Sequence, residues 1–168
     1  MSTPIRDIVA AELAASGLEQ AELNPADVAY IEHGIRSVLS GLKARRVWEN
    51  HIGPILTHKQ VLEVTGWSKQ ALSQAVREHR VVRLQAEDGS AGYSVAGFDD
   101  ATPARPIVGL KDVLKVWAGP DASGWMTASW LSTEQPELDG RTPRQALLDG
   151  DALAVVDLAH AATGRLAA

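Results

Sequence analysis

Hydrophobic residues recur at helical spacing along most of the chain. Residues 4–16 predict a short amphipathic helix, with Thr3 as its N-cap and Pro4 at its first position. Asn24-Pro25 repeats this cap-then-proline signal. One apolar stripe then predicts a second, longer helix that ends at the basic run 43–46; its members are Val28, Ile31, Ile35, Val38, Leu39 and Leu42.

The pattern changes between residues 56 and 79, where two short helices meet at a glycine. Thr57 is suited to cap the first helix, and Ser68 the second. Gly66 fits the positive φ of a tight turn, while Leu62 is spaced to pack across that turn and Leu72 to fix the second helix against the first. This spacing predicts a helix-turn-helix.

The next two apolar runs, 81–85 and 92–95, predict strands around a glycine-containing turn, which is the pattern of a β-hairpin wing. Residues 97–106 contain two prolines and predict a linker. Helical patterns follow at 108–117, 125–131, 143–148 and 152–162, the last capped by Asp151. We therefore expect a mainly α protein, with a winged helix-turn-helix region at 1–98 and a C-terminal helical bundle at 107–168.

Composition excludes several classes of function. The 168 residues are 45% hydrophobic and include no cysteine, which rules out disulfides, iron–sulfur clusters, thiolate metal sites and a cysteine nucleophile. No apolar run is long enough for a membrane span, so we expect a cytoplasmic protein. The five histidines are scattered, and no nucleophile or dinucleotide motif occurs. We expect no catalytic activity, no cofactor and no metal site.

Charge is distributed unevenly along the chain. The net charge is −5, yet from Lys43 to Arg83 eight basic residues face three acidic ones, leaving −10 for the remainder. A basic segment around a helix-turn-helix favours double-stranded DNA as the partner. The exposed polar positions of the second helix are suited to base edges and phosphates, and neighbouring side chains to the backbone. The predicted DNA-binding residues are Ser68, Lys69, Gln70, Ser73, Gln74, Arg77, Arg80, Arg83, Tyr93, Lys59, Arg45 and Arg46.

Other interpretations of these residues are structural. The basic stretch is also compatible with a solvated face, and the cations at 43–46 with the C-terminal end of a helix dipole. Trp117, Trp125 and Trp130 are compatible with either core packing or a partner surface.

The segment from Ala128 to Asp151 resembles the C-terminal toxin-binding domain of the Xre/MbcA/ParS antitoxins. The resemblance consists of Trp130-Leu131, Pro136-Glu137-Leu138 and Gly140-Arg141-Thr142-Pro143, followed by Leu148 and Gly150 ahead of a closing helix. It extends over roughly residues 107–165. The front half departs from the family pattern, because family members generally carry an Xre-like helical bundle there.

The resemblance implies an antitoxin that represses its own operon and neutralises a RES-domain toxin, an NAD-consuming enzyme. It places the toxin contact on residues 151–168, with Arg165 nearest the active site. The candidate partner-binding residues are Trp130, Arg141, Arg144, Asp157, His160 and Arg165. Two alternatives remain open: a stand-alone repressor, including one of phage type, whose C-terminal helices oligomerise, and a protein-interaction adaptor without DNA binding. A homodimer that reads a near-palindromic operator is expected in either regulator.

Overall fold

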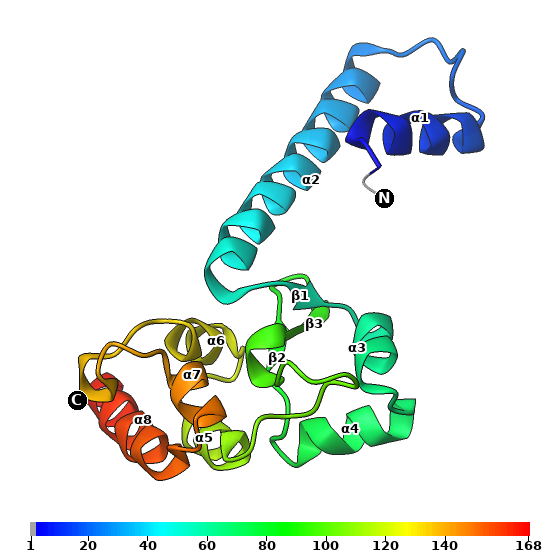
Figure 1. Ribbon diagram of the computed structural model, residues 1–168. Helices are drawn as coiled ribbons and strands as arrows, with labels where there is room; N and C mark the ends of the chain where they lie inside the picture. Colours follow the sequence, from blue (N-terminus) through cyan, green and yellow to red (C-terminus); the bar gives the residue numbers. More distant parts are fainter. Residues whose placement is uncertain (1–2) are drawn as a thin grey trace. The chain divides into compact units, whose positions relative to one another are not determined.

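The computed structural model describes residues 3–168, and its fold is mainly α (Figure 1). In this range there are eight α-helices, two 3-10 turns and a small three-stranded antiparallel sheet, which confirms the predicted fold class. The elements are α1 (Ile5–Ser16), α2 (Pro25–Ile52), β1 (Ile55–Leu56), α3 (His58–Thr65), α4 (Lys69–Arg77), β2 (Arg83–Gln85), β3 (Ala91–Ser94), η1 (Val95–Gly97), α5 (Leu110–Trp117), α6 (Trp125–Leu131), η2 (Pro136–Leu138), α7 (Pro143–Leu148) and α8 (Ala152–Leu166).

The chain divides into two compact units, residues 1–44 and residues 45–168. The first unit consists of α1 and most of α2. Pro4 occupies the N-cap of α1 and makes no side-chain cap, so the prediction of Thr3 at that position was wrong. Asn24 does cap α2, because its Oδ1 accepts the backbone N–H groups of Ala26 and Asp27 at 2.8 and 3.0 Å.

Helix α2 runs six residues beyond the predicted end at Arg46. The basic run therefore lies inside the helix rather than at its C-terminal end, and it does not complement the dipole there. Arg45 instead pairs with Glu49 one turn later at 3.1 Å and donates to the carbonyl of Ile55 at 3.0 Å. These contacts link the last turns of α2 to the first strand.

The sheet has the strand order β1-β3-β2, and both pairings are antiparallel. Strands β2 and β3 form the predicted wing. Sequence analysis missed β1, because two residues beside Pro54 carry no recognisable alternation. In Figure 1, α3 and α4 lie on one side of this sheet, and α5 to α8 lie on the other.

Two hydrophobic clusters form the core of the second unit. The smaller one lies beneath the helix-turn-helix and consists of Val61, Leu72, Ala75, Val81, Tyr93 and Phe98. The larger one joins Ile52, Val82 and Leu84 to apolar residues of α5, α6, α7 and α8. Because this cluster draws on both sides of the boundary expected near residue 98, the winged region and the C-terminal helices share one core.

The segment expected as a linker is packed into the structure. Phe98 is 1% exposed, and it forms an isolated β-bridge with Pro106. The N–H of Ile107 donates to the carbonyl of Gly97 at 3.1 Å, and Asp99 Oδ1 accepts from the backbone of Arg105 at 2.8 Å. Prolines and glycines here shape a folded turn rather than a flexible connection between domains.

Candidate nucleic-acid interface

Helices α3 and α4 are defined at both ends by local contacts. Thr57 and Gln60 form a capping box at the start of α3, with each side chain accepting the backbone N–H of the other. Gly66 ends α3 in the left-handed conformation, at φ +71°. Ser68 then accepts the N–H of Ala71 at 3.1 Å and starts α4. The predicted caps and turn are confirmed.

Helix α4 buries one face and exposes the other. Leu72 and Ala75 are completely buried, and Leu62 packs against the same cluster from α3. The predicted outer positions are all exposed: Ser68, Lys69, Gln70, Ser73, Gln74 and Arg77. The helix therefore presents an uninterrupted polar surface rich in hydrogen-bonding groups, with positive charge at both ends.

The C-terminal end of α4 is held by a small polar cluster. Glu78 accepts from Gln74 Nε2 and from Arg80 Nε, each at 2.8 Å. The hydrogen bond from Gln74, together with the hydrogen bond and charge of Arg80, holds the pKa of the Glu78 carboxyl below its ordinary value. Arg80 also lies over the Trp67 ring, 5.7 Å from its centroid. The side chains of Gln74 and Arg80 thus already make hydrogen bonds within the protein, both to Glu78.

Other predicted contacts are placed differently by the structure. Tyr93 is 6% exposed and belongs to the smaller core cluster, so it is unavailable for phosphate contact and its prediction as a DNA contact was wrong. Lys69, Arg77 and Arg83 are exposed, and their side chains make no ion pair with any described residue. Lys59 is exposed beside Glu63 at 3.7 Å, and Arg46 is exposed next to the engaged Arg45.

The tip of the wing is acidic. Glu87 and Asp88 are exposed in the turn between β2 and β3, where Gly89 has a φ of +84°. Hydrogen bonds from the Ser90 hydroxyl and N–H hold the pKa of Asp88 below its ordinary value. The two acidic side chains at the tip disfavour contact with phosphate. Any wing contact with DNA falls instead to Arg83, at the base of β2.

The outer edge of β2 is fastened to the loop that precedes α6. Gln85 donates its N–H to the carbonyl of Ser123 at 2.9 Å, and its carbonyl accepts from Trp125 Nε1 at 2.9 Å. Gly124 passes so close that a Cβ there would lie 2.1 Å from the Arg83 carbonyl oxygen. Sequence analysis singled out Trp125 but could not give this role, because its partner lies 40 residues away.

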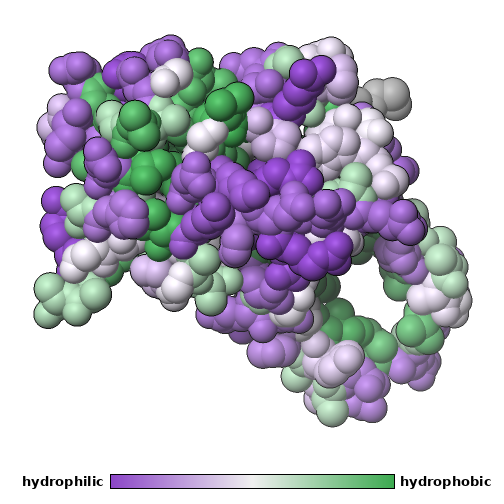
Figure 2. Space-filling model, turned by 90° about the horizontal axis from the view of Figure 1, so that it is seen from below, coloured by the Kyte–Doolittle hydropathy of each residue, from purple (hydrophilic) through white to green (hydrophobic). Residues whose placement is uncertain are grey.

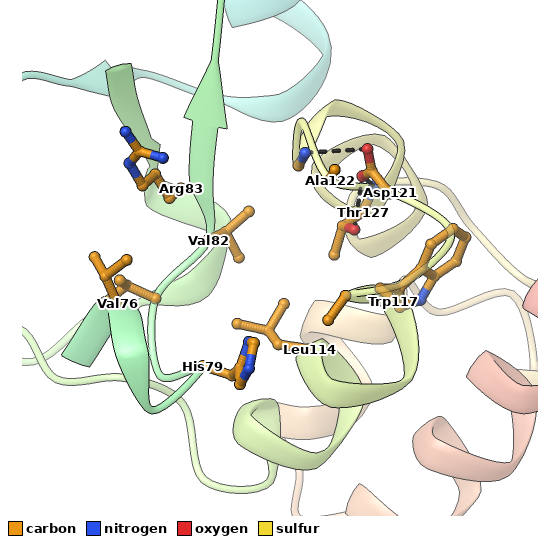
Figure 3. Close-up of a pocket in the computed structure, with 12 residues that line it drawn as sticks. Val76, His79, Val82, Arg83, Leu114, Trp117, Asp121, Ala122 and Thr127 are labelled. Carbon is orange, nitrogen blue, oxygen red and sulfur yellow. Dashed lines mark hydrogen bonds between the residues drawn. The ribbon is translucent and has the colours of Figure 1, made fainter. Parts of the chain in front are cut away.

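A cleft of about 200 Å³ separates the end of α4 from α5 and α6 (Figure 3). Val76, His79 and Val82 line one side, and Leu114 and Thr127 line the other. Its one carboxylate, Asp121, accepts from the N–H of Gly124 and from the N–H and hydroxyl of Thr127 at 2.7 to 3.0 Å. Asp121 therefore shapes the loop before α6. Between residues 3 and 168, no group of three or more His, Asp or Glu side chains is placed to hold a metal.

The candidate partner-binding residues lie apart from α4. Arg141 forms ion pairs with Asp149 and Asp151 at 2.7 and 2.8 Å, and both carboxylates raise its pKa. Asp151 thus joins α7 to α8 through Arg141 and makes no side-chain cap, contrary to its predicted role. Arg144 donates to the carbonyl of Phe98 and to Asp100.

The remaining three candidates, Asp157, His160 and Arg165, are exposed on α8. Trp130 is half-buried and lies 5.5 Å from Trp117, ring centroid to ring centroid.

Each part of the Gly140–Pro143 stretch has a local structural role. Gly140 takes a φ of +78° in the turn, and Thr142 forms a capping box with Gln145 at the start of α7. Pro143 is the first residue of the helix, where its missing N–H costs no hydrogen bond. The stretch is therefore explained by the turn and the helix that it builds.

Helix-turn-helix, three-stranded sheet and exposed polar second helix together define a winged helix-turn-helix fold extended by C-terminal helices. The chain is similar in fold to the NMR structure of Rv2175c, with a TM-score of 0.51 over 64% of this chain and 80% of that one. The two sequences are 23% identical, so the likeness concerns the fold alone.

No family model and no curated protein matches the chain. The resemblance to the Xre/MbcA/ParS antitoxins thus gains no support from these comparisons. Within the described part of the chain, no helix combines the length and apolar character that crossing a membrane requires.

Proposed function

We propose that this protein is a DNA-binding regulator that places α4 in the major groove of double-stranded DNA. The observation that carries the proposal is the exposed face of α4, which joins hydrogen-bonding side chains to the exposed cations Lys69 and Arg77. Major-groove readout uses such side chains on the second helix of a helix-turn-helix. No carboxylate interrupts this face before Glu78, which is itself engaged by Gln74 and Arg80.

Three further cations support the same docking. Arg83 lies at the base of the wing, Lys59 lies in the first turn of α3, and Arg46 lies on α2 just before the sheet. Cations beside a recognition helix neutralise phosphates and so supply affinity that is independent of sequence. The acidic wing tip limits this contact to the base of the wing.

Selection of DNA from a random duplex pool tests the proposal. We expect the full chain to enrich one sequence motif, and we expect Lys69→Ala or Arg77→Ala to weaken binding to that motif by about 1–3 kcal/mol if the side chain reads a base. Lys115→Ala removes the same charge from α5 and is the matched control. Equal affinity of Lys69→Ala, Arg77→Ala and the control would contradict the assignment of α4.

Two more specific hypotheses, an antitoxin and a stand-alone repressor, extend this proposal. Operon autorepression with neutralisation of a RES-domain toxin rests on the sequence stretch 128–151, whose residues have structural roles of their own. Affinity capture of the tagged protein beside Arg165→Ala and Asp157→Ala variants tests it: a stoichiometric NAD-consuming partner lost in the variants is the expected result for an antitoxin. Recovery of DNA alone favours the stand-alone repressor. Activity as an enzyme forms no part of the proposal.

A further inference from the structure

The first compact unit of the chain has no buried residue in its described part, 3–44. Thirteen large hydrophobic side chains of this segment are between 38% and 82% exposed. They are Ile5, Ile8, Val9, Leu13, Leu18, Leu23, Val28, Tyr30, Ile31, Ile35, Val38, Leu39 and Leu42. Figure 2 shows hydrophobic surface lying open on this unit, around the opening at the lower right. Helices such as α1 and α2 depend on burying their apolar faces, since helix propensity alone gives an isolated helix only marginal stability in water.

The stripe on α2 has the spacing of a coiled-coil seam. Val28, Ile31, Ile35, Val38 and Leu42 follow one another at intervals of three, four, three and four residues. This alternation places them at successive a and d positions of two heptads and at the first position of a third. The repeat stops at Leu42, and the residues at the next two seam positions, Arg45 and Glu49, pair with each other. The seam thus lies in the part of α2 whose apolar side chains are exposed in the single chain.

Two glycines border this seam, one heptad apart. Gly34 and Gly41 lie inside α2, where glycine lowers helix stability relative to alanine. A Cβ built on either one meets no atom within 4 Å, so packing within the described chain does not require glycine there. Small residues beside an apolar seam permit the backbone of a facing helix to approach closely.

Charge along α2 and the preceding turn is segregated. Residues 19–32 carry four acidic side chains and no basic one, whereas residues 33–46 carry four basic side chains and no acidic one. A second copy lying parallel would place like charges side by side. A second copy lying antiparallel places the acidic half of each helix beside the basic half of the other, and it also opposes the two helix dipoles.

We propose that α2 pairs with α2 of a second copy of this chain, antiparallel, through the seam Val28, Ile31, Ile35, Val38 and Leu42. The thirteen exposed side chains offer on the order of 1,000 Å² of apolar surface per chain, against about 800 Å² per partner in a standard interface. The apolar side chains of α1 are among these thirteen, so the pair reaches this area by covering α1 together with the seam. This inference concerns residues 3–46 and is independent of DNA binding by α4.

Light scattering on the full chain tests the pairing. We expect twice the mass of one chain at micromolar concentration, and the mass of one chain for Ile35→Asp. Ser40→Asp adds the same charge at an f position of the heptads, opposite the seam, and should retain the double mass. A single-chain mass for the wild-type protein would overturn the proposal. If that monomer also sedimented with vesicles of phosphatidylcholine and phosphatidylglycerol, the apolar face would belong to a lipid surface.

Cysteine cross-linking tests the orientation, because the natural chain contains no cysteine. Ile35→Cys, near the centre of the seam, should form a disulfide with itself under mild oxidation. Val28→Cys and Leu42→Cys should each remain uncross-linked alone and form a mixed disulfide when combined, since their partners lie at opposite ends. Efficient self-cross-linking of Val28→Cys would contradict the antiparallel arrangement.

The glycines give an independent readout. Gly41→Leu should increase the helicity of a single chain, because leucine is the better helix former, yet weaken the pair by at least tenfold by holding the helices apart. Increased helicity with unchanged association would show that the two α2 helices do not need to approach each other closely at Gly41. DNA selection with the Ile35→Asp monomer separates this inference from the proposed function: residual, weaker enrichment of the same motif indicates that α4 reads DNA without the pair.

Discussion

Gly124 and Gly89 share a left-handed backbone, at φ +81° and +84°, but differ in what surrounds them. A Cβ on Gly124 would collide with the backbone of Arg83, whereas a Cβ on Gly89 would meet nothing within 4 Å. The first glycine fixes the distance between β2 and the α6 loop, and the second only turns the chain. Their substitution therefore separates close approach from backbone strain.

We predict that Gly89→Ala lowers the free energy of unfolding by about 1 kcal/mol, the ordinary cost of an L-residue in this conformation. Gly124→Ala adds the displacement of β2, and the total loss should reach roughly 3 kcal/mol or more. Urea denaturation of both variants measures the difference. Equal losses would show that β2 can shift at little cost.

A second prediction concerns Glu78, whose pKa is held below its ordinary value by Gln74 and Arg80. Because the folded state binds the proton less readily than the unfolded state, the carboxylate stabilises the protein above its ordinary pKa, and this contribution is lost as the pH falls below it. Glu78→Gln should lower the melting temperature at pH 7 and have a smaller effect near pH 3. Glu134→Gln is the comparison variant, because Glu134 is exposed and its side chain makes no hydrogen bond or ion pair with any described residue. A constant difference across this pH range would exclude the ionised carboxylate as the cause.

At the scale of elements, helix starts are the most predictable feature of this chain. Ser68, Asn24 and Thr57 all cap helices where the sequence analysis places them, because a cap depends on residues two or three positions away. Asp151 does not cap α8 with its side chain, because its carboxylate forms an ion pair with Arg141, ten residues earlier in the chain. The end of α2 was misplaced because Glu49 pairs with Arg45 and prolongs the helix.

Thr57 permits a test of one such start. Thr57→Ala removes the acceptor for the Gln60 N–H and should lower the free energy of unfolding by about 1 kcal/mol. Thr57→Ser retains the hydroxyl and should remain within a few tenths of a kcal/mol of the wild-type value. Chemical denaturation compares the three proteins. A loss for serine as large as that for alanine would point to the threonine methyl group rather than the cap.

The candidate interface was predictable to the extent that it is local. The outer positions of α4 follow from helical periodicity, and all six are exposed. Tyr93 was misjudged because strand periodicity gives two faces without saying which is inside; here its side chain faces α3 and lies 6.3 Å from the His58 ring. Neither β1 nor the fastening of β2 to Trp125 has a local signal.

At the scale of the whole molecule, the shared core decides which fragments fold. The larger cluster contains Ile52, Val82, Leu84 and Ala96 beside the residues of α5 to α8. Cutting the chain after residue 98 would expose both halves of this cluster to water. The proline-rich stretch looked like a boundary because prolines mark folded turns as readily as linkers.

We predict that a fragment of residues 45–168 unfolds cooperatively at nearly the melting temperature of the full chain, because every buried residue of the described range 3–168 lies within it. A fragment of residues 1–98 should lack a cooperative transition. Calorimetry on both fragments measures this. A cooperative transition in the 1–98 fragment would favour the division into a winged region and an independent C-terminal bundle.

The fastening of β2 also limits how other chains can add to this protein. Open sheet edges are the places where foreign strands add and where aggregation by edge-to-edge pairing begins. Here the loop before α6 occupies the edge of β2, and the opposite edge is β1, two residues long and preceded by proline. The sheet thus offers almost no template for strand addition. Assembly with any partner must then use helix surfaces. Overexpressed protein should remain dispersed in solution rather than form β-rich aggregates.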